Sequence, residues 1–133
     1  MDFQRGIAVP RSKKIMVVDD EVGIRELLFD VLSKEGFAVT LAKDGQDSLQ
    51  QMRRRRFDLV ITDIDMPRVN GIELLRRMKR AGRKEKIIIM SGNTLNQEDI
   101  KREILPVITQ LDKPFQMDRM LEAVSSALAT THK

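Results

Sequence analysis

Asp63 is the residue whose setting most clearly suggests chemistry, and it lies in the stretch DLVITDIDMPRVNG from Asp58 to Gly71. The apolar run Leu59–Thr62 is too short for a helix and predicts a buried strand that ends on this carboxylate. Open parallel sheets place their ligand sites just outside the carboxyl ends of the strands. Asp63 is therefore expected to lie in such a site.

The other predicted core strands also end in polar side chains. Ile15–Val18 is followed by Asp19 and Asp20, Ile87–Met90 by Ser91, and Val107–Leu111 by Asp112 and Lys113. Because the carboxyl ends of parallel strands meet at one edge of a sheet, these side chains are expected to converge. Three carboxylates in one crevice repel each other unless a cation is bound between them.

Oxygen ligands without His or Cys favour Mg²⁺, which binds one or two carboxylates and keeps water for a phosphate. A metal ion, an ammonium and a hydroxyl around one carboxylate suit phosphoryl transfer. Asp63 is predicted to be the nucleophile and a metal ligand. Asp20 is predicted to bind the metal ion as well, with help from Asp19 and the backbone carbonyl of Asp65. Lys113 and Ser91 are predicted to contact the phosphoryl group.

Strands and helices alternate along the chain, which predicts an α/β fold with a parallel sheet and helices on both faces. Strands are expected at residues 15–18, 37–41, 59–62, 87–90 and 107–111. Helices are expected at 22–35, 45–55, 72–80, 96–104 and 116–128, with Asp44 or Gly45 opening the second. Residues 1–13 are expected to form a flexible arm, 14–129 one domain, and 130–133 a tail.

Composition limits the possible functions. The 133 residues contain no cysteine, which excludes disulfides and thiolate metal sites. They also contain no apolar stretch long enough for a membrane span or a signal peptide, so a cytoplasmic protein is expected. The net charge of +4 is modest, and Arg53–Arg56 and the cations from Arg76 to Lys84 are expected at helix ends, where they complement the helix dipole. Only five aromatic residues are present, which argues against direct nucleic-acid binding.

Each candidate residue also has a purely structural interpretation. Asp19, Asp20 and Ser91 precede helices and could be N-caps, Asp65 could be a turn residue, and Lys113 could be an ordinary surface lysine. Four of the five predicted strands end in a chemically useful group at the same edge of the sheet, and this coincidence favours a functional site over helix capping alone.

Four motifs together resemble the receiver domain of two-component response regulators, in the manner of a single-domain chemotaxis regulator. They are Asp19-Asp20, Asp63 followed by Met66-Pro67 and Gly71, Ser91-Gly92, and Lys113-Pro114-Phe115. The resemblance covers residues 14–129 and implies a flavodoxin-like (βα)5 fold with strand order 2-1-3-4-5. It implies that Asp63 accepts a phosphoryl group from a histidine kinase or a histidine phosphotransfer protein, and that the Lys113–Pro114 peptide bond is cis.

The resemblance also implies a two-state switch that is not an enzyme beyond its own phosphorylation and dephosphorylation. Phosphorylation would repack the face formed by the fourth helix, fifth strand and fifth helix, for recognition by a downstream target or by a second copy in a homodimer. The position three before Lys113, commonly aromatic in the family, is Gln110. The chain is expected to be a single-domain regulator or relay, or a receiver from a longer protein.

Two other functions fit part of the pattern. Asp63-Ile64-Asp65 resembles the DxD motif of haloacid-dehalogenase-type phosphatases, with Asp63 as nucleophile and Asp65 as general acid and base. Pro67 stands where that family prefers Thr or Val, and the acidic pair Asp19-Asp20 lies upstream rather than downstream. The second alternative is an interaction module that works without phosphorylation, and the complete set of reactive groups argues against it.

Overall fold

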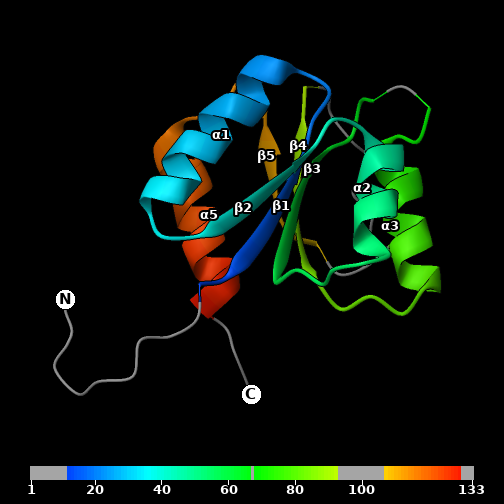
Figure 1. The fold of residues 1–133 in the computed structure, drawn as a ribbon. Helices are drawn as coiled ribbons and strands as arrows, with labels where there is room; N and C mark the ends of the chain where they lie inside the picture. Colours follow the sequence, from blue (N-terminus) through cyan, green and yellow to red (C-terminus); the bar gives the residue numbers. More distant parts are fainter. Residues whose placement is uncertain (1–11, 67, 93–106, 130–133) are drawn as a thin grey trace, which may run out of the picture.

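Five parallel strands form one sheet in the computed structural model, which describes residues 12–66, 68–92 and 107–129 (Figure 1). The spatial order of the strands is β2-β1-β3-β4-β5, which confirms the predicted doubly wound α/β fold. The strands are β1 (Lys14–Val18), β2 (Ala38–Ala42), β3 (Leu59–Asp63), β4 (Lys86–Ser91) and β5 (Val107–Asp112).

Helices connect the strands within the described part of the chain. They are α1 (Val22–Lys34), α2 (Gly45–Met52), α3 (Gly71–Arg80) and α5 (Met117–Ala129). The helix predicted at 96–104 lies outside the described residues, as do most of the predicted arm and the tail. Among the described helices, none has the length and apolar character needed to cross a membrane.

The three central strands, β1, β3 and β4, are buried on both faces of the sheet, which explains why their sequences are mostly apolar. Figure 1 shows α1 and α5 on one face and α2 and α3 on the other. Alternate residues of β1 divide between two cores: Ile15 and Val17 pack with α1 and α5, while Met16 and Val18 pack with α2 and α3. The three central strands are thereby fixed in position from both sides, and their carboxyl ends form a rigid edge.

The helix boundaries follow from capping residues and glycines. The Asp44 side chain accepts a hydrogen bond from the Asp47 backbone N–H (2.8 Å) and begins α2, as predicted. Asn70 caps α3 in the same way through Glu73 (2.9 Å). Gly82 follows α3 with a φ of 72°, a conformation that favours glycine.

The end of α2 differs from the prediction. The sequence predicted a helix through Arg55, but α2 ends at Met52 and its last turn contains no basic residue. The Arg83 guanidinium donates to the backbone carbonyls of Met52 (2.7 Å) and Arg55 (2.9 Å), so a distant side chain satisfies the carbonyls that a longer helix would have used. Arg53 is the C-cap of α2 and Arg54–Arg56 follow it, so these cations lie just beyond the last turn, whereas in α3 the last turn itself carries Arg77, Lys79 and Arg80.

The buried face of α1 is narrow. Leu28 and Leu32 are fully buried, but Leu27 is 46% exposed and does not face the core. The helix contacts the sheet mainly through one row of side chains four residues apart, which leaves the neighbouring Leu27 at the margin. Val22 and Phe29 are also exposed on this helix.

Candidate functional site

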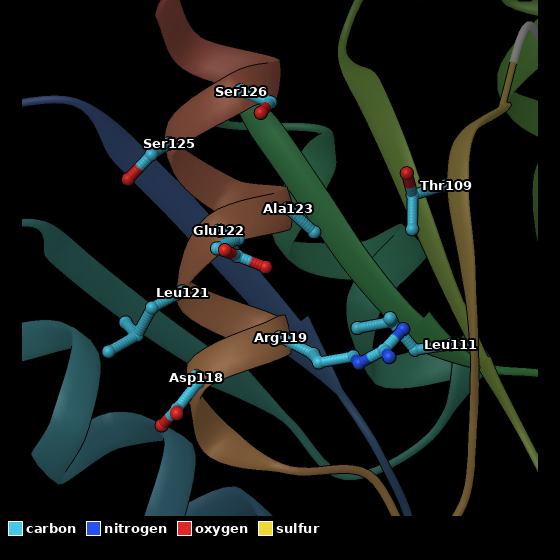
Figure 2. A pocket seen from close by; sticks show the side chains of 9 residues that line it. All are labelled: Thr109, Leu111, Asp118, Arg119, Leu121, Glu122, Ala123, Ser125 and Ser126. Atoms are coloured by element: carbon cyan, nitrogen blue, oxygen red, sulfur yellow. The ribbon is translucent and has the colours of Figure 1, made fainter.

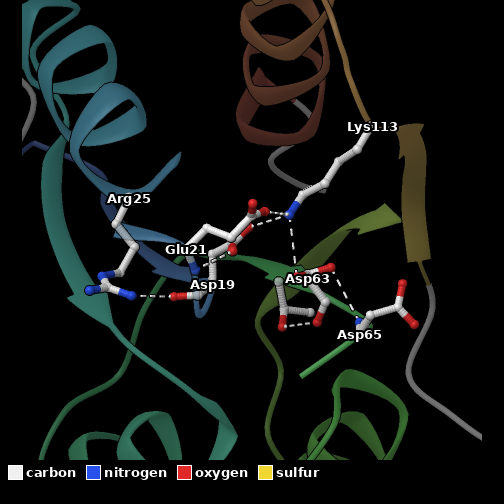
Figure 3. Close-up of polar contacts among 7 residues, drawn as sticks. Asp19, Glu21, Arg25, Asp63, Asp65 and Lys113 are labelled. Atoms are coloured by element: carbon white, nitrogen blue, oxygen red, sulfur yellow. Dashed lines mark hydrogen bonds and ion pairs between the residues drawn. The ribbon is translucent and has the colours of Figure 1, made fainter. Parts of the chain in front are cut away.

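The carboxyl edge of the sheet brings together Asp19, Asp63 and Lys113, as the strand ends predicted (Figure 3). β1 and β3 are neighbours with Val18 opposite Thr62, so the two aspartates lie at adjacent strand ends. The Lys113 Nζ atom reaches both, at 2.7 Å from Asp19 Oδ2 and 3.3 Å from Asp63 Oδ2. Lys113 lies 94 positions after Asp19 and 50 positions after Asp63 in the sequence, yet its ammonium contacts both carboxylates.

Asp19 is fully buried and held at both oxygens. Its Oδ1 accepts the backbone N–H of Glu21 (2.9 Å), while Oδ2 accepts from Lys113. The N-cap position of α1 is Glu21, and no side chain caps that helix. Capping therefore explains neither Asp19 nor the exposed Asp20, and the alternative interpretation of this pair is wrong.

Asp63 is the second buried carboxylate, with only 3% of the residue exposed. Its Oδ1 accepts the Asp65 backbone N–H (3.2 Å). Burial and then the nearby Asp19 raise the pKa of Asp63 above its ordinary value, and the Lys113 ammonium only partly opposes them. The site therefore holds its central carboxylate in an environment that favours its neutralisation.

Lys113 supplies the compensating charge. Burial acts to lower its pKa, but hydrogen bonds to the carboxylates of Asp19 and Glu21 outweigh that effect, and the pKa is raised. The pKa of Asp19 is raised because burial outweighs its hydrogen bond to Lys113. One ammonium among several carboxylates leaves the site with an excess of negative charge.

The acidic residues fit a divalent metal ion. Asp19, Asp20 and Asp63 each offer one carboxylate oxygen, and these atoms lie within 4.8 Å of one another. Oxygen donors in this number, with carboxylates and room for water, match the preference of Mg²⁺. The exposed Asp20 opens the cluster to solvent.

Ser91 ends β4 beside Lys113. Ser91 is buried, and its backbone carbonyl accepts the Lys113 backbone N–H (2.7 Å). The Lys113–Pro114 peptide bond is cis, which confirms the geometry implied by the family resemblance. Phosphoryl contact by Ser91 and metal binding by the carbonyl of Asp65 stay predictions.

The loop between β3 and α3 is fixed against the start of α2. Arg68, with a φ of 63°, forms an ion pair with Asp44 (2.8 Å), the residue that caps α2. A Cβ atom on Gly45 would collide with the Val69 carbonyl oxygen, and one on Gly71 would collide with the Asp63 carbonyl oxygen. Glycine at both positions allows the loop to pack closely against the start of α2 and the end of β3.

Glu21 is the site residue that the sequence analysis missed. Its Oε1 atom accepts a hydrogen bond from Lys113 Nζ (3.0 Å), and its side chain is 63% exposed (Figure 3). The three successive acids from Asp19 to Glu21 were the available signal. The contact itself depends on how far the side chain of Lys113, 92 residues later in the sequence, extends toward Glu21.

Comparison with known proteins identifies the family. Residues 15–125 match the response regulator receiver domain family. This chain belongs to that family. Sporulation initiation phosphotransferase F of Bacillus subtilis is 37% identical over 118 residues, covering 88% of this chain and 94% of that relative. These matches favour the receiver function over the phosphatase alternative and the interaction module.

Other relatives of this receiver domain are longer or have known structures. Transcriptional regulatory protein FixJ of Bradyrhizobium diazoefficiens is 36% identical over 86% of this chain, which spans 56% of that relative. The receiver domain of an HD domain-containing protein from Pseudomonas fluorescens has a TM-score of 0.82, with 27% identity over 90% of this chain and 96% of that one. TrrA of Thermotoga maritima, solved with Mg²⁺ and BeF, has a TM-score of 0.76, with 32% identity over 86% of this chain and 98% of that one.

Proposed function

We propose that this receiver domain works in a phosphorelay, in which Asp63 accepts a phosphoryl group from a phosphohistidine. The observation that carries the proposal is a buried carboxylate at a strand end, 3.3 Å from a lysine ammonium and beside two further aspartates. A receiver of this kind acts on itself and passes on a signal, rather than turning over an external substrate.

The transfer step forms one covalent bond to the protein, at Asp63, and the other residues of the site position and neutralise the transferred group. An oxygen of the Asp63 carboxylate attacks phosphorus, the phosphorus–nitrogen bond of the phosphohistidine breaks, and its electron pair stays on the imidazole nitrogen. Lys113 donates to one phosphoryl oxygen and Ser91 to another, so charge on the transferred group is neutralised. The hydrogen bond from Asp65 N–H to Asp63 Oδ1 orients the acceptor.

Mg²⁺ would be held by Asp19, Asp20, Asp63 and the backbone carbonyl of Asp65. When bound, it supplies positive charge for the transferred oxygens. Two observations support this choice: the three carboxylates lie within 4.8 Å, and TrrA, a relative with 32% identity, was solved with Mg²⁺ and BeF.

The upstream partner in this proposal is a histidine kinase or a histidine phosphotransfer protein, and the downstream partner is a target protein. A groove of about 630 Å³ runs between β5 and α5, lined by Thr109, Leu111 and one side of the helix (Figure 2). Gln110 lies between two of these lining residues, so strand alternation directs it to the opposite face. We assign the β5–α5 face to the target, and recognition there does not require an aromatic side chain at position 110.

The test is phosphorylation by acetyl phosphate, with and without Mg²⁺, followed by intact mass. Wild type is expected to gain one phosphoryl group only with Mg²⁺, and Asp63→Asn is expected to gain none. Asp30→Asn, which replaces an exposed aspartate of α1, is the matched control and should behave as wild type. Equal labelling of Asp63→Asn would contradict the proposal, and rapid donor hydrolysis without an adduct would indicate a phosphatase.

A further inference from the structure

We propose that Glu21 is a positioning residue that holds the Lys113 ammonium in the unphosphorylated protein and releases it when Asp63 is phosphorylated. Glu21 would thus act as an internal substitute for a phosphoryl oxygen. The inference rests on the proposed function, because it concerns the lysine that contacts the transferred group.

The first observation is that Lys113 has no spare donor. An ammonium has three N–H groups, and Nζ contacts three carboxylates, at 2.7 Å from Asp19, 3.0 Å from Glu21 and 3.3 Å from Asp63. A new hydrogen bond from Lys113 to a phosphoryl oxygen therefore requires that an existing one be broken or shared.

The second observation is that the three carboxylates differ in what their release would cost. The Asp19 side chain is completely buried and would be left in the core without its counter-charge, which is strongly unfavourable. Asp63 carries the phosphoryl group itself. The Glu21 side chain is 63% exposed, so water replaces Lys113 at its carboxylate at little cost. Of the two carboxylates that do not receive the phosphoryl group, Glu21 is therefore the one that Lys113 leaves at the lower cost.

This arrangement has a kinetic consequence. Lys113 stabilises charge on the transferred group only after its contact with Glu21 has been given up, so that contact adds to the barrier for phosphorylation. Removal of the contact is expected to raise the rate of phosphorylation by acetyl phosphate by up to about fivefold, the upper end of what an exposed ion pair contributes.

Two substitutions separate the contact from the charge. Glu21→Gln removes the negative charge, whereas Glu21→Asp keeps it on a side chain that is one methylene shorter and withdrawn from Nζ. Both should accelerate Mg²⁺-dependent phosphorylation by acetyl phosphate if the contact matters. Acceleration by Glu21→Gln alone would show a general repulsion of the anionic donor and overturn the inference. Glu26→Gln, an exposed glutamate of the same helix, should leave the rate at the wild-type value.

A double-mutant cycle provides a second readout. In a Lys113→Gln background, where phosphorylation is slower, Glu21→Gln should no longer change the rate, because there is no ammonium to release. An unchanged fivefold effect in that background would show that Glu21 acts independently of Lys113, which contradicts the inference.

The possible failures are distinguishable. If wild type is phosphorylated and both Glu21 variants match its rate, only the role of Glu21 is wrong. If wild type gains no phosphoryl group from acetyl phosphate or from a phosphohistidine donor, the proposed function and this inference fail together.

Discussion

Asp63 is held in the protein at an energetic cost. Its pKa is raised by burial and by Asp19, so the folded state favours the neutral side chain more than the unfolded state does. Asp63→Asn is therefore expected to stabilise the Mg²⁺-free protein at pH 7, measured as a higher midpoint of urea unfolding than that of wild type. Lower stability of the variant at pH 7 would contradict this account.

The pH dependence of this difference has a defined sign. The penalty is fully present above the raised pKa of folded Asp63, and it is lost as the pH falls from there through the lower pKa that this carboxyl has in the unfolded chain. The stability difference between Asp63→Asn and wild type should therefore shrink with decreasing pH.

The sequence predicts the core of the site because strand ends are visible as apolar runs followed by charge. Asp19, Asp63 and Lys113 were found on that basis, and the structure brings them into contact. Glu21 was not found, because its contact depends on the length and direction of two side chains rather than on the register of strands.

At the scale of elements, the start of α2 depends on Asp44. This carboxylate accepts the Asp47 N–H and pairs with Arg68, and these hydrogen bonds hold its pKa below the ordinary value. Asp44→Ala is expected to lower the free energy of unfolding by about 1–2 kcal/mol, measured in urea. Asp44→Asn keeps the cap without the ion pair and should cost less. An equal cost for both variants would assign the effect to Arg68 rather than to the cap.

The contribution of the Asp44 charge is present above the unfolded pKa of an aspartate. It should be lost as the pH falls through the lower pKa of the folded state. The difference between Asp44→Asn and wild type is therefore expected to be constant near neutral pH and to disappear in acid.

Strands were easier to predict than helix ends. β1, β3 and β4 are buried on both faces, so their sequences are uninterrupted apolar runs with clear limits. The end of α2 is set by Arg83, a residue 31 positions beyond Met52, and Arg53–Arg56 are themselves good helix formers. Local sequence therefore contained no signal for that boundary.

At the scale of the whole molecule, a metal ion would join β1 to β3 across the acidic edge and stabilise the domain. Mg²⁺ at about 100 times its dissociation constant should add roughly 2.7 kcal/mol to the free energy of unfolding. Asp20→Asn should lose most of this gain yet unfold normally without Mg²⁺, because Asp20 is exposed. An unchanged Mg²⁺ response in Asp20→Asn would place the ion elsewhere.

The contact between Lys113 and Asp19 closes a loop of 94 residues. Contacts of such long sequence separation form late, since loop closure must come before they can contribute. A nascent chain that still lacks β5 has its acceptor aspartate but not the ammonium that serves it. The full rate of phosphorylation is therefore expected only when synthesis and folding of the domain are nearly complete, so incomplete chains are poorer competitors for the phosphodonor than finished ones.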